Sequence, residues 1–285
     1  MLCAQLRGFA AAGWGGVEIQ PFRVGLPHDL SADAAAAVHE VFTPRWFETV
    51  AAVMAEAERL GMTVDLTFGS AWPFGGGAAI TPELSAQEAT LAWTPVRGPA
   101  HYRGRPNQPA RPLRFGARLE RDGEVDTAQT LPDGWRARID AMAAVVAVLA
   151  LRGGEPSLGP FPGFVVPLTL PDPWGQVHAP GWVDAAATLD LTERLQPDGT
   201  LDWDVPPGDW QIVVVRRFAS DQRIGEGAGR GPQLVLDHLK RDAFDAHAAR
   251  VGAAALPHGS RFAGRPWRAV FVDSLEIPAD LHWTD

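Results

Sequence analysis

Three short apolar runs in this sequence contain, or end in, polar side chains that could perform acid–base chemistry. These side chains are, in chain order, Glu18 and Gln20, then Asp65, then Asp273 and Glu276. Two carboxyl groups on different strands of one barrel mouth are what glycosidic cleavage needs: one protonates the poor leaving group, and the other activates water or attacks the sugar. The alternative for each acid is a surface or capping role, and one strand end alone does not separate the two.

Two of the candidate ligand-binding residues have an equally simple structural interpretation. Asp65 lies inside its apolar run and could be a buried acid that pairs with an arginine. Trp72, in the loop "SAWPFGGG", could be a flat platform for a sugar ring or could cap the core. The glycines of this loop do not form a phosphate-binding loop, because the Gly-Lys-Ser/Thr ending and the following helix are missing.

Other catalytic classes find little support in the sequence. Ser274 does not lie in a G-x-S-x-G motif, which argues against a hydrolase nucleophile elbow. The eight histidines are scattered and show no H-E-x-x-H spacing, so no metal site is predicted from them. Asp237 is most simply a first-turn acid of a predicted helix, where the helix dipole stabilises a negative charge.

Composition restricts the partners. The formal net charge of −9 argues against nucleic acid as a partner, because binding phosphates requires clustered basic side chains. No run approaches the roughly 18 apolar residues of a membrane span.

Cys3 is the only cysteine, so no intrachain disulfide can form. The start of the chain is too short and too interrupted by Arg7 to be a signal peptide, and it reads as a helix inside a domain.

The elements at the two ends of the chain predict a parallel α/β arrangement. A short helix over 3–12 and a strand over 15–21 precede a helix over 44–60, which begins at a proline and ends before a glycine. A strand over 62–69 follows, so strand, helix and strand form a βαβ unit. A helix over 235–252 and the run "WRAVFVDSLEI" repeat this pattern near the end of the chain.

The middle of the chain has a β-rich sequence pattern instead of the alternating strand and helix pattern of the two ends. Short β-type runs are separated by Pro, Gly and Asp-Gly turns, and no convincing amphipathic helix is present. The string "PDGTLDWDVPPGDWQIVVV" predicts a hairpin whose turn is "PPGD". We therefore predict an α/β fold in which a partial (β/α)8 TIM-type barrel is interrupted by an inserted antiparallel β-sandwich-like domain. The predicted domains are 1–82, 83–232 and 233–285.

Several strings together resemble glycoside hydrolase family 106, the α-L-rhamnosidases. They are "GWGGVEIQPF", "AERLGMTVDLTFGSAWPFGG", "LDLTERLQPDGTLDWDVPPGDWQIVVVR" and "VFVDSLEI…HWTD", and their order fits nearly the whole chain. The resemblance implies a catalytic (β/α)8 barrel, an inverting mechanism with two glutamates, and a calcium ion near the sugar hydroxyls. It also implies a glycoside or oligosaccharide substrate from plant or bacterial glycans.

The resemblance also assigns roles to individual residues. Glu276, in "DSLE", is the expected general acid. The residues expected to shape the sugar or metal subsite are Glu18, Gln20, Asp65, Trp72 and Asp273. Members of the family are much longer than this chain, so we expect a fragment with barrel strands two to four, whose second catalytic glutamate lies on a later strand. A periplasmic or secreted location is expected only for the full-length parent.

Two further interpretations stay open. The β-rich middle could be a carbohydrate-binding region that holds a glycan through its tryptophans, Trp174, Trp182, Trp203 and Trp210. The chain could also be a truncated gene product without activity, because a barrel that lacks strands leaves unpaired edges.

Overall fold

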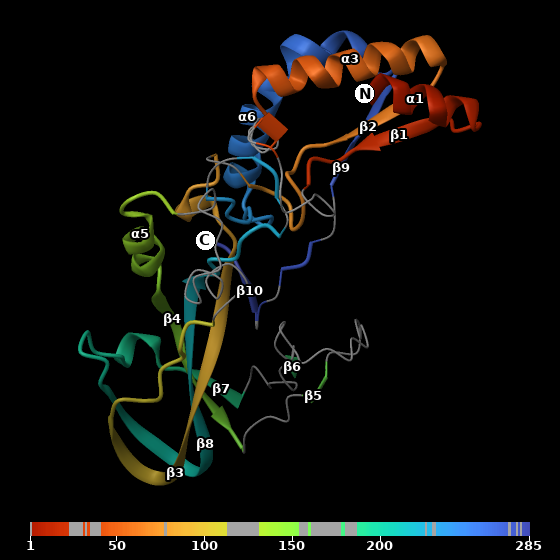
Figure 1. Ribbon diagram of the computed structural model, residues 1–285. Coiled ribbons are helices and arrows are strands. Elements are labelled where there is room, and N and C mark those ends of the chain that lie inside the picture. Colours follow the sequence, from red (N-terminus) through yellow and green to blue (C-terminus); the bar gives the residue numbers. More distant parts are fainter. Residues whose placement is uncertain are drawn as a thin grey trace. The chain divides into compact units, whose positions relative to one another are not determined.

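The computed structural model (Figure 1) describes most of the chain, in two compact units. The α/β unit comprises residues 1–86, 116–135 and 221–277, and the β unit comprises 87–115, 136–220 and 278–285. Within these limits the described residues are 2–22, 31, 33–34, 41–76, 79–112, 131–153, 159–160, 178–179, 187–225, 227–229, 232–272, 275–277, 279 and 281–285.

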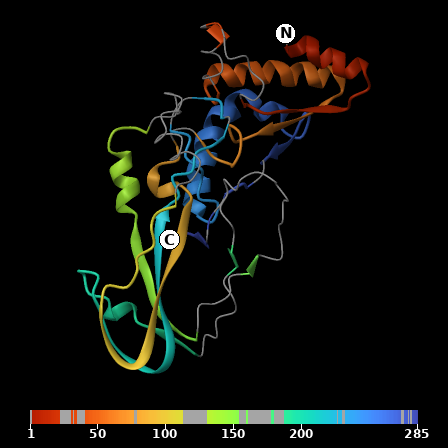
Figure 2. The same ribbon diagram turned by 60° about the horizontal axis from the view of Figure 1, so that its bottom comes forward.

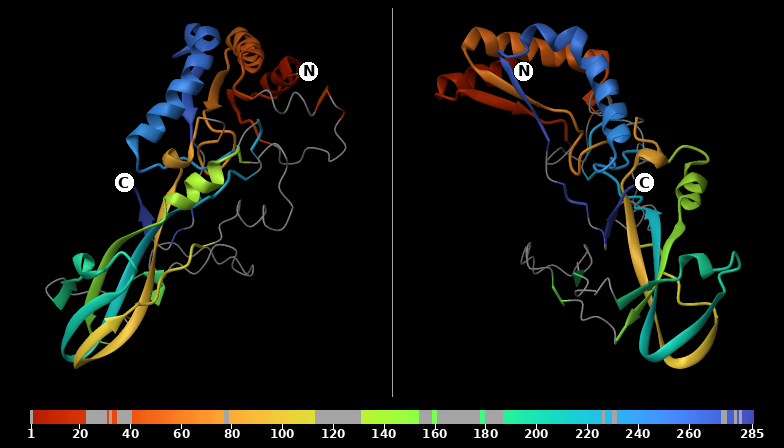
Figure 3. Two further views of the ribbon diagram at one scale, coloured as in Figure 1. Left: turned by 90° about the vertical axis from the view of Figure 1, so that its left-hand side faces the viewer. Right: turned by 180° about the vertical axis from the view of Figure 1, so that it is seen from behind.

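The α/β unit contains a parallel sheet of three strands in the order β1-β2-β9. The strands are β1 (Gly16–Ile19), β2 (Thr63–Thr67) and β9 (Trp267–Phe271), and both pairings are parallel. Helix α3 (Pro44–Leu60) connects β1 to β2, and α6 (Arg241–Gly259) precedes β9; α1 (Leu2–Ala11) comes before β1. The predicted βαβ arrangement is therefore present, and Figure 3 shows α3 and α6 on the same face of this sheet.

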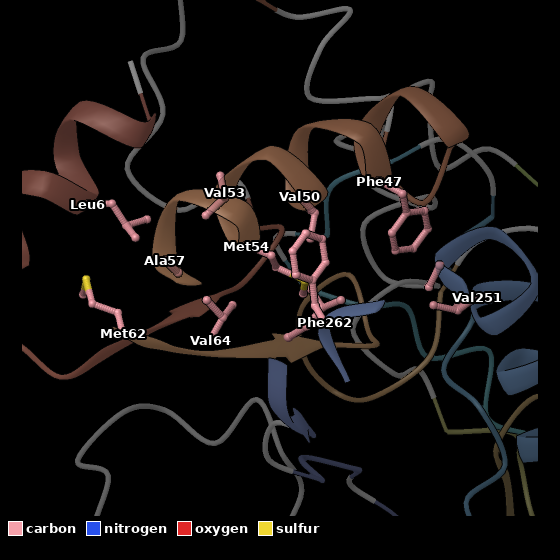
Figure 4. Close-up of a cluster of buried hydrophobic side chains, with 12 residues drawn as sticks. Leu6, Phe47, Val50, Val53, Met54, Ala57, Met62, Val64, Val251 and Phe262 are labelled. Carbon is pink, nitrogen blue, oxygen red and sulfur yellow. The ribbon is translucent and has the colours of Figure 1, made fainter. Parts of the chain in front are cut away.

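Local signals explain the limits of α3. The side-chain oxygen of Thr43 accepts a hydrogen bond from the Trp46 amide, Pro44 occupies the first turn, and Gly61 ends the helix in the left-handed conformation with φ 70°. The buried side chains recur at helical spacing, as the sequence predicts. Figure 4 shows this apolar stripe packed between α3 and the sheet. It contacts Met62 and Val64, which lie just before and within β2, and Val251 and Phe262, which lie within and just after α6.

The β unit contains one antiparallel sheet of five strands, in the order β10-β3-β8-β4-β7. The strands are β3 (Gln87–Gly104), β4 (Ala144–Arg152), β7 (Thr188–Asp190), β8 (Leu201–Ala219) and β10 (Leu281–Trp283). A separate pair joins β5 (Gly159–Pro160) to β6 (His178–Ala179). Figure 2 shows β3 and β8 running side by side as a long curled ribbon.

This sheet corrects two predictions. The expected hairpin with a "PPGD" turn is wrong, because β8 continues through these residues and pairs with β3 on both sides of them. The strand bends there instead: a Cβ on Gly98 of β3 would lie 1.9 Å from the carbonyl oxygen of Pro206, so only glycine fits. A β-sandwich is not shown, because the described residues of this unit form one curled sheet and the short β5-β6 pair, not two packed sheets.

Three further elements and one boundary differ from the sequence-based expectation. Helix α5 (Trp135–Ala141) lies in a region where no helix is predicted. Helix α6 starts at Arg241 and not at 235, because Leu234, Val235 and Leu236 form backbone bridges with Arg223, Gly75 and Ser85. The described residues 221–225, 227–229 and 232 belong to the α/β unit, whereas β10 belongs to the β unit through its pairing with β3.

The remaining helical turns are short. They are the 3-10 turns η1 (Pro82–Leu84), η4 (Thr192–Arg194) and η5 (Ser260–Phe262). None of the helices in the described part of the chain is long and apolar enough to cross a membrane. Taken together, the chain mixes helices and sheets as an α/β protein, with a parallel sheet in one unit and an antiparallel sheet in the other, and a closed TIM barrel is not shown.

Candidate functional site

The parallel sheet of the α/β unit has one apolar face and one polar face. Val17, Ile19, Val64 and Leu66 pack against the helices in the apolar core. Since side chains alternate along a strand, the residues between them point to the opposite face. These are Glu18 on β1 and Asp65 on β2, which are register partners across the two strands. The fold therefore places two predicted site residues side by side on the polar face.

Glu18 accepts hydrogen bonds from two neighbours at the carboxyl end of the sheet. The side-chain amide of Gln20 donates to Glu18 Oε1, and the hydroxyl of Thr67 lies 3.5 Å from the same oxygen. Thr67 is buried, whereas Glu18 is exposed. The carboxylate is thus held by donors on one side and open to solvent on the other, which suits a group that accepts hydrogen bonds from a ligand hydroxyl.

Asp65 forms an ion pair with Arg268 at the start of β9. Arg268 Nε lies 3.0 Å from Asp65 Oδ1, and its Nη2 donates to Oδ2, so the contact is bidentate. The hydrogen bond to Asp65 raises the pKa of the Arg268 guanidinium. The sequence left open whether Asp65 pairs with an arginine or binds a ligand, and the structure shows the arginine pair.

Trp72 lies in the loop that follows β2, and the backbone fixes it. Its carbonyl accepts a hydrogen bond from the Gly225 amide at 2.9 Å, and the half-buried residue packs against a small apolar cluster that includes Ala71 and Ile224. The ring of Phe22 meets it edge to face at 6.1 Å. One part of the indole fills this cluster and the rest is accessible, so the structure combines features of both roles that the sequence left open.

Glu276 lies five residues beyond the end of β9, with its side chain exposed. Two contacts hold its backbone. Gln222 donates a hydrogen bond of 2.7 Å from Nε2 to the Glu276 carbonyl. The next residue, Ile277, is buried in the apolar cluster that Trp72 packs against. The Glu276 segment and the Trp72 loop therefore share one packed cluster of the α/β unit.

Other predicted residues are placed differently or lie outside the described part of the chain. Asp273, Trp174 and Trp182 are outside the described residues. Trp203 and Trp210 are only 4% and 6% exposed and meet edge to face at 5.7 Å inside the core of the β unit. Rings buried in this way cannot stack on a sugar, so these two tryptophans do not support the carbohydrate-binding interpretation.

Sequence reasoning missed the polar residues that follow β8. Arg223 and Asp221 form an ion pair at 3.3 Å in which both side chains are almost fully buried, and Arg223 Nη1 also donates to the Pro232 carbonyl. Gln222, between them, is the residue that holds the Glu276 backbone. The only sequence signal was a run of polar residues, "SDQR", directly after a strongly apolar strand.

The residues present do not by themselves fit the calcium ion that the resemblance implies. Among the described residues, no group of three or more His, Cys, Asp or Glu side chains could hold a metal ion. Calcium takes six to eight oxygen ligands, whereas the Asp65 carboxylate already binds Arg268 and Glu18 is met by two hydrogen-bond donors.

Comparisons with known proteins agree with the parallel α/β unit and with the resemblance. The family model of glycoside hydrolase family 106, alpha-L-rhamnosidase, matches residues 171–285. The solved structure of a rhamnosidase from Novosphingobium sp. PP1Y aligns with 99% of this chain at a TM-score of 0.55 and 15% identity. At this identity the likeness concerns the fold alone. No curated protein matches the chain.

The matches also give the extent of the similarity. This chain spans 37% of the length of the Novosphingobium rhamnosidase, and the family match covers the segment that includes β8, α6, β9 and Glu276. The resemblance predicted from the sequence is thereby confirmed: residues 171–285 carry the sequence pattern of the α-L-rhamnosidases of glycoside hydrolase family 106.

Proposed function

We propose that this chain is part of a glycoside hydrolase that cleaves terminal α-L-rhamnosyl linkages with inversion, and that Glu276 is its general acid. The observation that carries the proposal is the place of Glu276. It follows the carboxyl end of a parallel strand, within the segment that matches the rhamnosidase family, and its carboxyl group is exposed above a backbone fixed by Gln222 and Ile277. In parallel α/β folds, functional side chains gather at this end of the strands.

The proposed reaction is a single displacement. Protonated Glu276 donates its proton to the glycosidic oxygen as the bond from that oxygen to the anomeric carbon breaks, and the alcohol leaves. A second carboxylate removes a proton from a water molecule whose oxygen attacks the opposite face of the anomeric carbon. In an inverting pair the two carboxyl groups stand about 6.5–9.5 Å apart, which leaves room for this water.

The remaining predicted residues are proposed to shape the sugar subsite. Glu18, oriented by Gln20 and Thr67, would accept hydrogen bonds from sugar hydroxyls. Trp72 would offer the accessible part of its ring to the apolar face of the sugar. Asp65 would act indirectly, by holding Arg268 on the polar face of the sheet. Asp273, which lies outside the described residues, is proposed for this subsite from its place in the sequence after an apolar run.

Calcium and the cellular location also stand as proposals from the resemblance. Since the described residues alone do not supply a calcium site, the reaction proposed above routes no step through a metal ion. The substrate would be a rhamnosyl glycoside of plant or bacterial origin, and the parent protein would be periplasmic or secreted.

The test is the variant Glu276→Gln in the full-length protein. The amide keeps the shape of the side chain but has no acidic proton, so hydrolysis of an α-L-rhamnoside with a poor alcohol leaving group should fall by at least about a hundredfold. An aryl rhamnoside with an acidic phenol should be less affected, because its leaving group needs little protonation. Glu193→Gln, in η4 of the β unit, is the matched control and should keep full activity.

The stereochemistry is measured separately. Proton NMR of the first-formed sugar should show the β anomer from an α-linked substrate. A retained anomer would exclude inversion, and turnover of both substrates by Glu276→Gln at the wild-type rate would remove Glu276 as the acid.

A further inference from the structure

A small cavity lies between α6 and the loop that follows β2. Its polar lining comes from Ser70, Gln233, His247 and Arg250, and its volume is about 20 Å³. A site needs roughly 10–15 Å³, measured in this way, to hold one water molecule. The cavity is therefore large enough for a single water and too small for a sugar or any other organic ligand.

Gly76 keeps this space open. Its backbone has φ 85°, and a Cβ at this position would lie 2.5 Å from Gln233 Oε1 and 2.7 Å from Ser70 Oγ. Any larger residue would collide with the polar lining and would also be strained at this φ. The hydroxyl of Ser70 donates to Gln233 Oε1 at 2.9 Å, so two walls of the cavity are already joined.

His247 presents a defined hydrogen-bonding state to the cavity. Its Nε2 lies 2.6 Å from the carbonyl oxygen of Phe68 at the end of β2. A carbonyl only accepts hydrogen bonds, so Nε2 carries the proton. Burial lowers the pKa of His247 and so disfavours the charged ring; the hydrogen bond to the Phe68 carbonyl opposes this shift, and the positive charge of Arg250 adds to it. In a neutral imidazole with a proton on Nε2, Nδ1 is an acceptor.

This acceptor has no donor among the residues that the structure describes. His247 is 1% exposed, and Nδ1 has no hydrogen-bond partner among the described residues. The ring of Phe74 packs against the His247 ring in an edge-to-face arrangement, with the two ring centroids 5.0 Å apart. A buried acceptor without a donor costs about 1–3 kcal/mol, and native proteins commonly remove this cost with an internal water.

We propose that the cavity binds one ordered water molecule, which donates a hydrogen bond to His247 Nδ1 and connects α6 to the segment that follows β2. The side chains of Ser70, Gln233 and Arg250 supply the further partners that such a water requires. A metal ion does not fit, because no group of metal-ligating side chains surrounds the site in the described part of the chain.

The water site has a consequence for the loop that carries Trp72. His247 holds Phe68 through Nε2, and the water would hold the wall formed by Ser70 through Nδ1. The start of the loop is then tied to α6 at two points by one side chain. This places His247 as a positioning residue for the loop, independently of whether Trp72 contacts a sugar.

Two measurements on the chain test the site directly. A crystal structure that resolves internal waters should show a single peak within about 2.7–3.2 Å of His247 Nδ1. In solution, long-range ¹H–¹⁵N NMR of the imidazole should show a proton on Nε2 and a hydrogen-bonded Nδ1, with an exchange-independent cross-peak to a bound water. An empty cavity in the crystal, or a proton on Nδ1 at neutral pH, would overturn the proposal.

The variant His247→Gln separates the two ring nitrogens. A glutamine amide can reach the position of Nε2 and donate to the Phe68 carbonyl, but it places no acceptor where Nδ1 lies. The water should be absent from this variant while the Phe68 contact is kept. A water at the same place in His247→Gln would show that Ser70 and Gln233 bind it alone, and it would refute the role given to His247.

Discussion

The side chain of Gln222 holds the backbone of Glu276 through a hydrogen bond of 2.7 Å from Nε2 to the carbonyl oxygen. The two residues are 54 positions apart in the sequence, and Gln222 is 2% exposed. A buried amide donor aimed at a main-chain carbonyl fixes the backbone of an otherwise exposed segment. The proposed acid therefore has an exposed side chain on a restrained backbone.

Replacing Gln222 by alanine should destabilise the α/β unit. The change removes the donor and leaves the Glu276 carbonyl without it, at an expected cost of about 1–3 kcal/mol in the free energy of unfolding, measured by urea denaturation. Gln196→Ala is the control, because Gln196 is exposed and its amide bonds only to the neighbouring Arg194 carbonyl. Equal stabilities of the two variants would contradict the restraining role of Gln222.

The tryptophans of the β unit should respond to substitution as core residues. Trp203→Ala should lower the free energy of unfolding by about 3–5 kcal/mol, because the ring fills the core beside Trp210. Trp14→Ala, at a ring that is 59% exposed, should change stability by less than about 0.5 kcal/mol. Glycan binding that weakens in Trp203→Ala without loss of stability would revive the carbohydrate-binding interpretation.

The pair of Asp65 and Arg268 should be weakly coupled. Arg268 is largely exposed, so water and salt screen the interaction despite its bidentate geometry. A double-mutant cycle with Asp65→Asn and Arg268→Met, followed by thermal denaturation, should give a favourable coupling that shrinks as sodium chloride is added. A coupling that does not depend on salt would show that the pair is shielded from solvent.

Local sequence signals were sufficient to predict an element whose ends are set by the residues at those ends. Thr43, Pro44 and Gly61 define the ends of α3, and its buried face follows the helical repeat, so the predicted range 44–60 is confirmed. Asp202 and Asp204 are exposed on either side of the buried Trp203, so β8 shows the two-residue alternation of a half-buried strand.

Local sequence signals gave wrong predictions where pairing with a segment distant in the sequence determines the local structure. "PPGD" has the composition of a turn, but the 18 residues of β3 pair along β8 and keep the strand extended. Residues 235–239 have helical spacing, yet Val235 and Leu236 bridge to Gly75 and Ser85. For the site, the sequence indicated that Asp65 could pair with an arginine, but not that the partner lies 203 residues away.

The contact of Gln222 with Glu276 and the buried state of His247 could not be predicted for the same reason. Both depend on which segments the fold brings together, and neither residue belongs to a recognisable motif. A glutamine after a strand or a histidine inside a helix is chemically uninformative until its surroundings are known.

Two histidines should change stability with pH in opposite directions. Burial lowers the folded-state pKa of His247, so its contribution is present above the unfolded pKa of about 6.5 and is lost as the pH falls below it. The pKa of His101 is raised, first by its hydrogen bond to Asp204 and then by the charge of Asp202. Its contribution is therefore present below about 6.5 and is lost as the pH rises through the folded pKa.

Urea denaturation of the wild type, His247→Gln and His101→Gln between about pH 5 and pH 8 separates these effects, because this range brackets the unfolded histidine pKa. The wild type should lose stability as the pH falls below about 6.5, and His247→Gln should remove most of that slope because no buried imidazole then needs a proton on unfolding. His101→Gln should keep the slope and alter only the alkaline side, and only slightly, since His101 and both aspartates are exposed. A slope that is unchanged in His247→Gln would mean that other titrating groups cause the pH dependence and that burial of His247 contributes nothing to it.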